Sequence, residues 1–160
     1  MPALPTGIPT TGVLPPRAIR AAAEIARGVC DAWRESAACT GSPWPYGFCI
    51  DTSLAVVDEL RDHIPIVCPT QVWGWFGLPG KPYVEEQVFP SSAARCGHTW
   101  VVLGDGTLLD PTAGQFDVFW NATDARLDRE LLVLGREALE QGFFEVRTWR
   151  DERGEVHRVV

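Results

Sequence analysis

The run from Gly97 to Thr112 constrains the fold more than any other part of the sequence. Residues 101–103 and 107–109 are apolar or β-branched, and the Gly-Asp-Gly segment between them is a strong hairpin signal. The sequence therefore predicts two antiparallel strands joined by a short turn. His98 stands at the start of the first strand, and Asp110 stands at the end of the second.

The length of the turn decides whether the side chains of His98 and Asp110 can meet. A turn centred near Gly104 sets His98 directly opposite Asp110 on one face, where a carboxylate can hold an imidazole by one ring nitrogen. A two-residue turn at 105–106 instead sets Asp110 opposite Val101 and directs it to the other face. We favour a loop of three or five residues, or a bulge, because Gly104 supplies a second flexible position.

A helix is predicted over residues 49–63, directly after a Pro/Gly-rich loop at 36–48. Pro65 ends it, and Cys49 lies in its first turn. A helix N-terminus and a neighbouring imidazolium each lower the pKa of a thiol from its ordinary value of ~8.5. We therefore predict Cys49 as nucleophile, His98 as its base and Asp110 as the group that orients His98. The backbone N–H of Cys49 is a candidate oxyanion donor.

Length and composition indicate one globular domain. Residues 17–160 are long enough for a single core, and residues 1–16, with five prolines, are predicted to form a flexible arm. The net charge of −7 excludes a basic surface for nucleic acid. The sequence shows no charged-then-apolar leader and no long apolar run, so no membrane partner and a cytoplasmic location are expected, unless the protein is a toxin or effector delivered elsewhere.

The remaining elements complete an α+β pattern. We predict a nucleophile-bearing helix packed on an antiparallel sheet of four to six strands, with the active site at the helix–sheet junction. The other expected elements are a helix from 17 to about 33, strands at 66–76 (interrupted at Pro69) and 83–89, a helix at 126–141, and a closing hairpin of 143–149 and 155–160.

Several short runs resemble a known family. Gly47-Phe48-Cys49, Ser53-Leu54, His98-Thr99-Trp100-Val101-Val102 and Asp110-Pro111-Thr112 are similar to the Cys-His-Asp signature of the transglutaminase-like branch of the papain-like superfamily. The run from His98 to Phe116 is most similar to bacterial papain-fold proteins, which include glutamine deamidase toxin domains. The resemblance implies a papain-like core and a thiol enzyme that attacks an amide or acyl group through an acyl-enzyme, which water or an amine resolves.

The sequence departs from the papain proteases in two respects, one of which is that their Cys-Gly-x-Cys-Trp run is missing. Pro43 stands six residues before Cys49, where those proteases carry a glutamine, so proteolysis of the papain type is not expected. Deamidation of glutamine is the most specific expectation, with acyl transfer in peptide or small-molecule biosynthesis as a second. A non-catalytic module of the same fold that binds a peptide on its aromatic surface is the alternative from another class.

The predicted substrate is a protein, a peptide or a small-molecule amide. Four residues are candidates to contact it: Trp44, Gln71, Trp73 and Trp100. The indole N–H of Trp44 or Trp73, or the amide of Gln71, are alternatives for the second oxyanion donor. Cys96 and His98 lack the paired spacing of zinc ligands and no glycine-rich phosphate loop opens a helix, so neither a metal nor a cofactor is predicted. The odd count of five cysteines, without a CxxC pair, favours reduced thiols.

Overall fold

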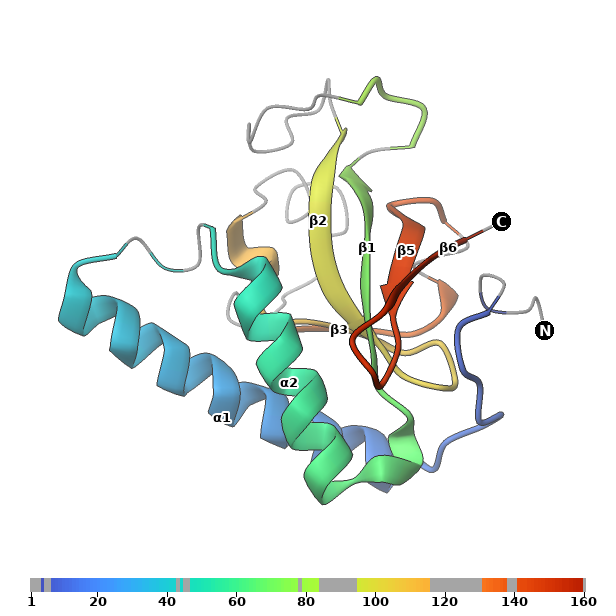
Figure 1. Ribbon diagram of the computed structural model, residues 1–160, viewed down its shortest axis with the longest axis horizontal. Helices are drawn as coiled ribbons and strands as arrows, with labels where there is room; N and C mark the ends of the chain where they lie inside the picture. Colours follow the sequence, from blue (N-terminus) through green and yellow to red (C-terminus); the bar gives the residue numbers. More distant parts are fainter. Residues whose placement is uncertain are drawn as a thin grey trace.

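The computed structural model describes residues 4, 7–42, 44, 47–77, 79–83, 95–115, 131–137 and 141–159 (Figure 1). The helical elements are α1 (Pro16–Thr40), α2 (Cys49–His63), and the short 3-10 helices η1 (Pro65–Val67) and η2 (Ala113–Gln115). The strands are β1 (Thr70–Gly77), β2 (Arg95–Val102), β3 (Leu108–Asp110), β4 (Leu132–Leu134), β5 (Phe144–Arg150) and β6 (Val156–Arg158). None of these helices combines the length and the apolarity that a membrane crossing needs.

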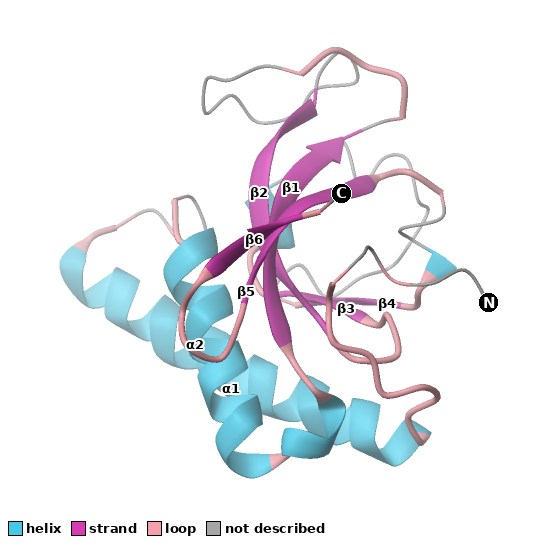
Figure 2. Ribbon diagram, turned by 45° about the vertical axis from the view of Figure 1, so that its right-hand side comes forward, coloured by secondary structure: helices cyan, strands magenta, loops and turns pink. Residues whose placement is uncertain are grey.

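In the described part of the chain, six strands form one antiparallel sheet in the order β4-β3-β2-β1-β5-β6. Both long helices lie on the same side of it, and α2 lies beside the strands (Figures 1 and 2). The predicted α+β arrangement of helices on an antiparallel sheet is therefore confirmed.

The sheet separates two cores because successive side chains of a strand point to opposite faces. On the helix face, Val101 and Leu109 pack against an alanine-rich side of α1 and the buried side of α2. On the far face, Trp100 packs with Phe76 and Phe144. His98 and Asp110, at even-numbered positions of β2 and β3, share the far face with Trp100.

The first helix is longer than predicted. Buried Ala37 continues its apolar side beyond Trp33, where the sequence indicated an end. The chain leaves the helix at Gly41, which has a φ of 70° and donates its N–H to the carbonyls of Ala37 and Ala38. Glycine adopts this left-handed conformation without steric cost, so Gly41 ends the helix.

The described part of the predicted N-terminal arm packs on the molecule. Leu4 and Ile8 are buried in the far-face core, and Leu14 is buried in the helix-face core. Thr11 donates its backbone N–H to the carbonyl oxygen of Gly104 at 3.0 Å, in the turn between β2 and β3. Three apolar side chains among the prolines thus fix this segment to the sheet.

Two predicted elements differ from the structure. The strand predicted from Ile66 starts only at Thr70, because Pro65 opens η1 and Cys68 adopts a left-handed φ of 49°. The helix predicted over 126–141 is wrong at Leu132–Leu134, which pair with β3 as strand β4. The rest of that prediction, apart from 131, 135–137 and 141, lies outside the described residues, as do residues 84–89 of the strand predicted at 83–89. The closing hairpin is confirmed as β5 and β6.

Gly74 gives a stability test of the sheet. The pairing of β1 with β5 shifts between Trp73 and Gly74, and a Cβ at Gly74 would overlap the carbonyl oxygen of Glu145. We expect Gly74→Ala to lower the free energy of unfolding by about 1–3 kcal/mol. Gly28→Ala is the control, since nothing lies within 4 Å of its Cβ position in α1, and it should raise stability by up to about 1 kcal/mol. Urea unfolding of both variants measures this, and equal effects would contradict the close approach of β1 and β5.

Candidate active site

His98 and Asp110 form a buried pair at the centre of the molecule. The Nε2 atom of His98 lies 2.6 Å from Oδ2 of Asp110, and both side chains have no exposed surface. The other carboxylate oxygen, Oδ1, accepts the backbone N–H of Thr112 at 3.1 Å. Both oxygens of Asp110 are thus engaged, which fixes the carboxylate and, through it, the imidazole.

The hairpin register explains how this pair forms. Val101 pairs with Leu109, and Leu103 donates its N–H to the carbonyl oxygen of Thr107 at 2.8 Å. The loop therefore contains three residues, 104–106, with Gly106 at a φ of 92°. A three-residue loop was among the predicted alternatives, but the direct opposition of His98 and Asp110 is wrong. This register sets Trp100 opposite Asp110, and His98 reaches the carboxylate as its diagonal neighbour.

Aromatic rings hold the imidazole in place. The ring of Trp100 lies 5.8 Å from that of His98 at an interplanar angle of 24°, and the ring of Phe76 lies 6.0 Å away. Trp100 is completely buried. Trp100 thus packs beside the imidazole with no exposed surface, and its predicted contact with a substrate stays a prediction. Trp100 serves to position His98.

Cys49 approaches His98 from the first turn of α2. Its thiol is half-buried, and the side chain of His98 and the backbone of Thr99 both act on it to lower its pKa. Since Nε2 of His98 is held by Asp110, Nδ1 is the ring nitrogen that faces the thiol. The structure thus brings Cys49, His98 and Asp110 together.

The short length of β3 makes room for the thiol. In an antiparallel sheet, the backbone N–H groups of every second residue in a strand point to the same neighbouring strand. On β2, the N–H of Leu103 points toward β3. The N–H of Thr99 therefore points to the same side, but β3 ends at Asp110, before it reaches this position. The start of α2 lies at this edge, which lets Cys49 reach an imidazole on the face opposite to the helices.

The site favours a thiolate beside an imidazolium. Burial raises the pKa of Cys49, but the hydrogen bond and charge of His98, together with the N–H of Thr99, outweigh it and lower that pKa below its ordinary value of 9.0. Burial also opposes a charge on His98, yet the charge and hydrogen bond of Asp110, with a smaller effect of Cys49, raise the pKa of His98 to about 9. Each group therefore stabilises the charged form of the other.

Gln71 ties the start of α2 to the sheet. Its Nε2 donates to the carbonyl oxygen of Ile50 at 3.0 Å and to Oγ of Ser53 at 2.8 Å. Ser53 in turn donates to the carbonyl oxygen of Cys49 at 2.6 Å. Both N–H bonds of the Gln71 amide are therefore engaged, so Gln71 positions the nucleophile helix and is not available in this conformation as the second oxyanion donor.

The predicted Trp44 and Trp73 lie on either side of the start of α2. The ring of Trp44 lies 5.3 Å from that of Phe48, the residue before Cys49, and packs against the helix-face core. Trp73 is half-buried on β1, opposite Thr99 in the register with β2. Trp73 borders a cavity, as described next, whereas Trp44 supports the turn into α2.

A cavity of about 170 Å³ lies on the helix face of the sheet, beside the first turn of α2. It is lined by Ile50 of α2, by Gln71, Val72 and Trp73 of β1, by Thr99 of β2, and by Thr148, Trp149, Arg150 and Val156 of the β5–β6 hairpin. Ile50 follows the nucleophile, and the backbone of Thr99 helps to lower the pKa of Cys49. Arg150 was not predicted as a site residue, because no local motif in the sequence marks it.

Asp151, Glu155 and His157 form a further group in the β5–β6 hairpin, with ligand atoms within 4.8 Å of one another. Oδ1 of Asp151 accepts the backbone N–H groups of Arg153 and Glu155 at 2.8 and 2.9 Å, and Oδ2 lies 2.7 Å from Nε2 of His157. The His157 hydrogen bond holds the pKa of Asp151 below its ordinary value. These bonds account for the cluster as a cap of the hairpin turn, the structural role predicted for His157.

The pair also predicts how stability depends on pH once Cys49 is removed. In Cys49→Ala, His98 keeps Asp110, the larger cause of its raised pKa. The stabilisation of the fold by protonated His98 is therefore fully present below pH 6.5 and is lost as the pH rises toward 9. The difference in free energy of unfolding between Cys49→Ala and Cys49→Ala/His98→Gln should fall over this window, by at most about 1.4 kcal/mol per pH unit.

The wild type should show a flatter profile. The pKa of Cys49 is lower in the folded protein than the 9.0 of an unfolded chain. The stabilisation of the fold by the Cys49 thiolate is therefore fully present above pH 9.0 and is lost as the pH falls through the pKa of the folded protein. The two slopes have opposite signs and partly cancel. Urea unfolding between pH 6 and 9 measures both profiles, and a pH-independent difference between the two variants would contradict the raised pKa of His98.

Comparisons with known proteins found no family model, no curated protein and no solved structure that matches this chain.

Proposed function

We propose that this protein is a thiol-dependent enzyme that hydrolyses or transfers an acyl group from an amide through a Cys49-His98-Asp110 triad. The observation that carries the proposal is the buried His98–Asp110 pair, together with the Cys49 thiol at the start of α2, whose pKa the imidazole lowers. The His98–Asp110 distance is 2.6 Å, and the pKa of Cys49 is lowered while that of His98 is raised. This is the arrangement of nucleophile, base and orienting group that nucleophilic catalysis requires.

The reaction follows from these roles. The Cys49 thiolate attacks the carbonyl carbon of an amide and forms a C–S bond, and the electron pair of the C=O bond moves to the oxygen. Collapse of this intermediate breaks the C–N bond, and the His98 imidazolium gives its proton to the leaving amine or ammonia. The thioester is then attacked by water or an amine that loses its proton to neutral His98, which restores the thiol and releases the acid or the new amide.

The start of α2 can stabilise the oxyanion. Cys49 is the first residue of the helix, and the first N–H groups of a helix have no intrahelical acceptor. The N–H of Cys49 lies next to the sulfur and suits an oxygen on the attacked carbon. The helix dipole favours both this oxygen and the thiolate.

Glutamine deamidation is the most specific form of the proposal, supported by the resemblance of the run from His98 to Phe116 to papain-fold deamidases. A panel of glutamine-containing peptides, incubated with and without a primary amine, tests it. We expect ammonia release with the wild type and none above background with Cys49→Ala, while an amide product formed only in the presence of the amine would identify acyl transfer. Equal background for both proteins across amide and ester donors would contradict the proposal.

One observation favours the alternative of a peptide-binding module. The ring of Trp75 lies 4.5 Å from that of Trp73 and 3.8 Å from that of partly exposed Tyr83, which makes an aromatic strip along β1. Such a strip can bind a peptide without chemistry. Binding of the same peptides with unchanged affinity to Cys49→Ala, without turnover by the wild type, would favour this module.

A further inference from the structure

Arg150 is a cation whose partners within the described residues are neutral. Its Nε donates to Oε1 of Gln71 at 3.0 Å, and its Nη1 donates to the carbonyl oxygen of Gly154 at 3.0 Å. Neither acceptor carries a charge, and no carboxylate of the described part of the chain lies within ion-pair distance of it. In a protein with a net charge of −7, a half-buried arginine without an acidic partner needs an explanation.

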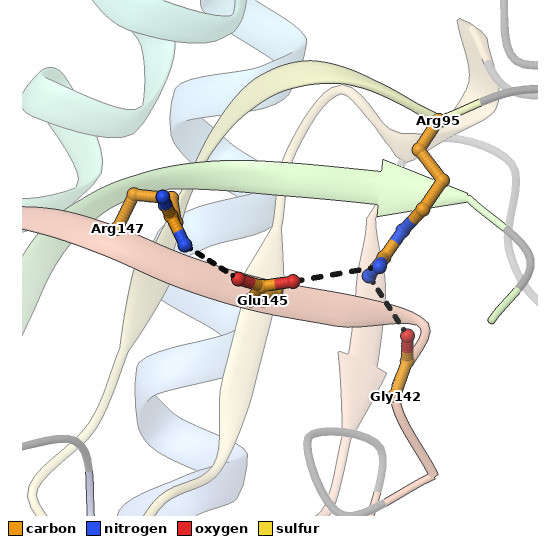
Figure 3. A network of polar contacts seen from close by, with 4 residues as sticks. All are labelled: Arg95, Gly142, Glu145 and Arg147. Atoms are coloured by element: carbon orange, nitrogen blue, oxygen red, sulfur yellow. Dashed lines mark hydrogen bonds and ion pairs between the residues drawn. The ribbon is translucent and has the colours of Figure 1, made fainter. Parts of the chain in front are cut away.

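Two other arginines near the sheet show the contrast. Arg147, on the same strand, donates to Oε1 of Glu145 at 2.8 Å, and Arg95 lies 3.4 Å from Oε2 of the same carboxylate (Figure 3). Arg95 also donates to the carbonyl oxygen of Gly142 at 3.0 Å. Among the described residues, Glu145 thus lies between these two cations, and no carboxylate plays that part for Arg150.

The place of Arg150 points to the ligand that would supply the missing charge. Its side chain lines the cavity beside the first turn of α2, together with Ile50, which follows Cys49 in the sequence, and Thr99, whose backbone helps to lower the pKa of Cys49. Gln71 holds Nε and Gly154 holds Nη1, so the guanidinium has a fixed orientation and Nη2 remains for a ligand. A fixed guanidinium suits a carboxylate, which accepts directional, charge-assisted hydrogen bonds.

We propose that Arg150 is a specificity-determining residue that binds a carboxylate of the acyl donor while Cys49 attacks its amide. This inference rests on the proposed function and names its substrate class: an amide whose carbon skeleton also carries a carboxylate. A cavity of about 170 Å³ accommodates a small acidic group. Trp73 and Trp149 provide apolar surface for the carbon chain between the two ends.

The test uses thiol reagents that carry the carboxylate themselves. N-ethylmaleimide is the neutral reagent, and a series of maleimidoalkanoic acids with increasing tether length provides the acids. The rate of Cys49 modification, read by peptide mass spectrometry, gives an acid-to-neutral ratio for each protein. We expect the wild type to prefer one tether length, and Arg150→Gln to lower this ratio about tenfold. Arg150→Lys, which keeps the charge, should retain part of the preference.

Arg147→Gln is the matched control, because it removes the same charge from the same strand outside the cavity, and it should leave the ratio unchanged. Any effect that loss of the Arg150–Gln71 contact has on the reactivity of Cys49 acts on both reagents alike. Dividing the rate with the acid reagent by the rate with N-ethylmaleimide therefore cancels it. A ratio that is equal in wild type and Arg150→Gln, or that falls equally in Arg147→Gln, would overturn the inference. If N-ethylmaleimide modifies Cys49 no faster than Cys68 at neutral pH, this result counts against the proposed function instead.

A second measurement needs no variant. Glutarate should slow the modification of wild-type Cys49 by N-ethylmaleimide more than sodium chloride does at the same ionic strength, since the dicarboxylate occupies the Arg150 cavity. Equal slowing by the two salts would contradict a carboxylate site, whatever the folding of the Arg150 variants.

Discussion

Replacement of His98 by glutamine should slow the alkylation of Cys49 at pH 6 by about tenfold or more, because a thiol of ordinary pKa is almost entirely protonated there. The hydrogen bond and charge of His98 are the main effects that lower the pKa of Cys49, and without them burial dominates and raises it. Any turnover should fall more steeply, by about a hundredfold or more, since the variant also lacks the general acid and base. Iodoacetamide labelling and the peptide assay measure the two effects.

His157→Gln is the matched control for this variant. His157 also bonds a carboxylate, at 2.7 Å from Asp151, but it lies in the β5–β6 hairpin. Its replacement should leave the labelling of Cys49 at pH 6 unchanged. Equal labelling of Cys49 in wild type and His98→Gln would show that the imidazole does not activate the thiol.

Replacement of Asp110 by alanine should destabilise the fold by about 3–5 kcal/mol at neutral pH, the usual cost of removing one partner of a buried charge pair. His98 and Asp110 are both fully buried, so the variant leaves the imidazole without its carboxylate and the N–H of Thr112 without its acceptor. His98 must then lose its proton to stay buried, which also removes the charge that favours the thiolate. Asp110→Asn keeps the shape and should cost less.

Urea unfolding at pH 7 measures this effect, and an exposed pair provides the control. Glu59 lies 3.2 Å from His63 on the surface of α2, where solvent screens the interaction. Glu59→Gln should therefore change the free energy of unfolding far less than Asp110→Ala. A loss of similar size in both variants would mean that the buried pair contributes no more than a surface contact.

The sequence was informative where the chemistry is local. The Gly-Asp-Gly turn predicted the hairpin, and the position of Cys49 after a loop predicted its place at the start of α2. The exact pairing was harder, because a shift of one residue in a turn changes every cross-strand neighbour. Gly106 with its φ of 92° fixed the three-residue loop, and this made His98 a diagonal neighbour of Asp110.

Contacts between distant segments were not predictable from local patterns. Leu132–Leu134 form a strand because they pair with β3, although their composition also suits a helix. Trp100 was predicted as a substrate contact, and the sequence does not show that it packs beside the imidazole with no exposed surface. Arg150 joins the site through Gln71, a residue 79 positions away, so only the assembled sheet reveals it.

The most direct test of the active-site account is the pH dependence of iodoacetamide labelling at each cysteine of the wild type. All five cysteines are free. Burial raises the pKa of Cys96 to about 11 and also raises that of Cys68, whereas the contact with His98 lowers that of Cys49. The midpoint of each labelling profile reports the pKa of that thiol independently of its accessibility. We expect a lower midpoint for Cys49 than for Cys68 and Cys96, and a Cys49 midpoint equal to or above theirs would contradict the proposed activation of this thiol.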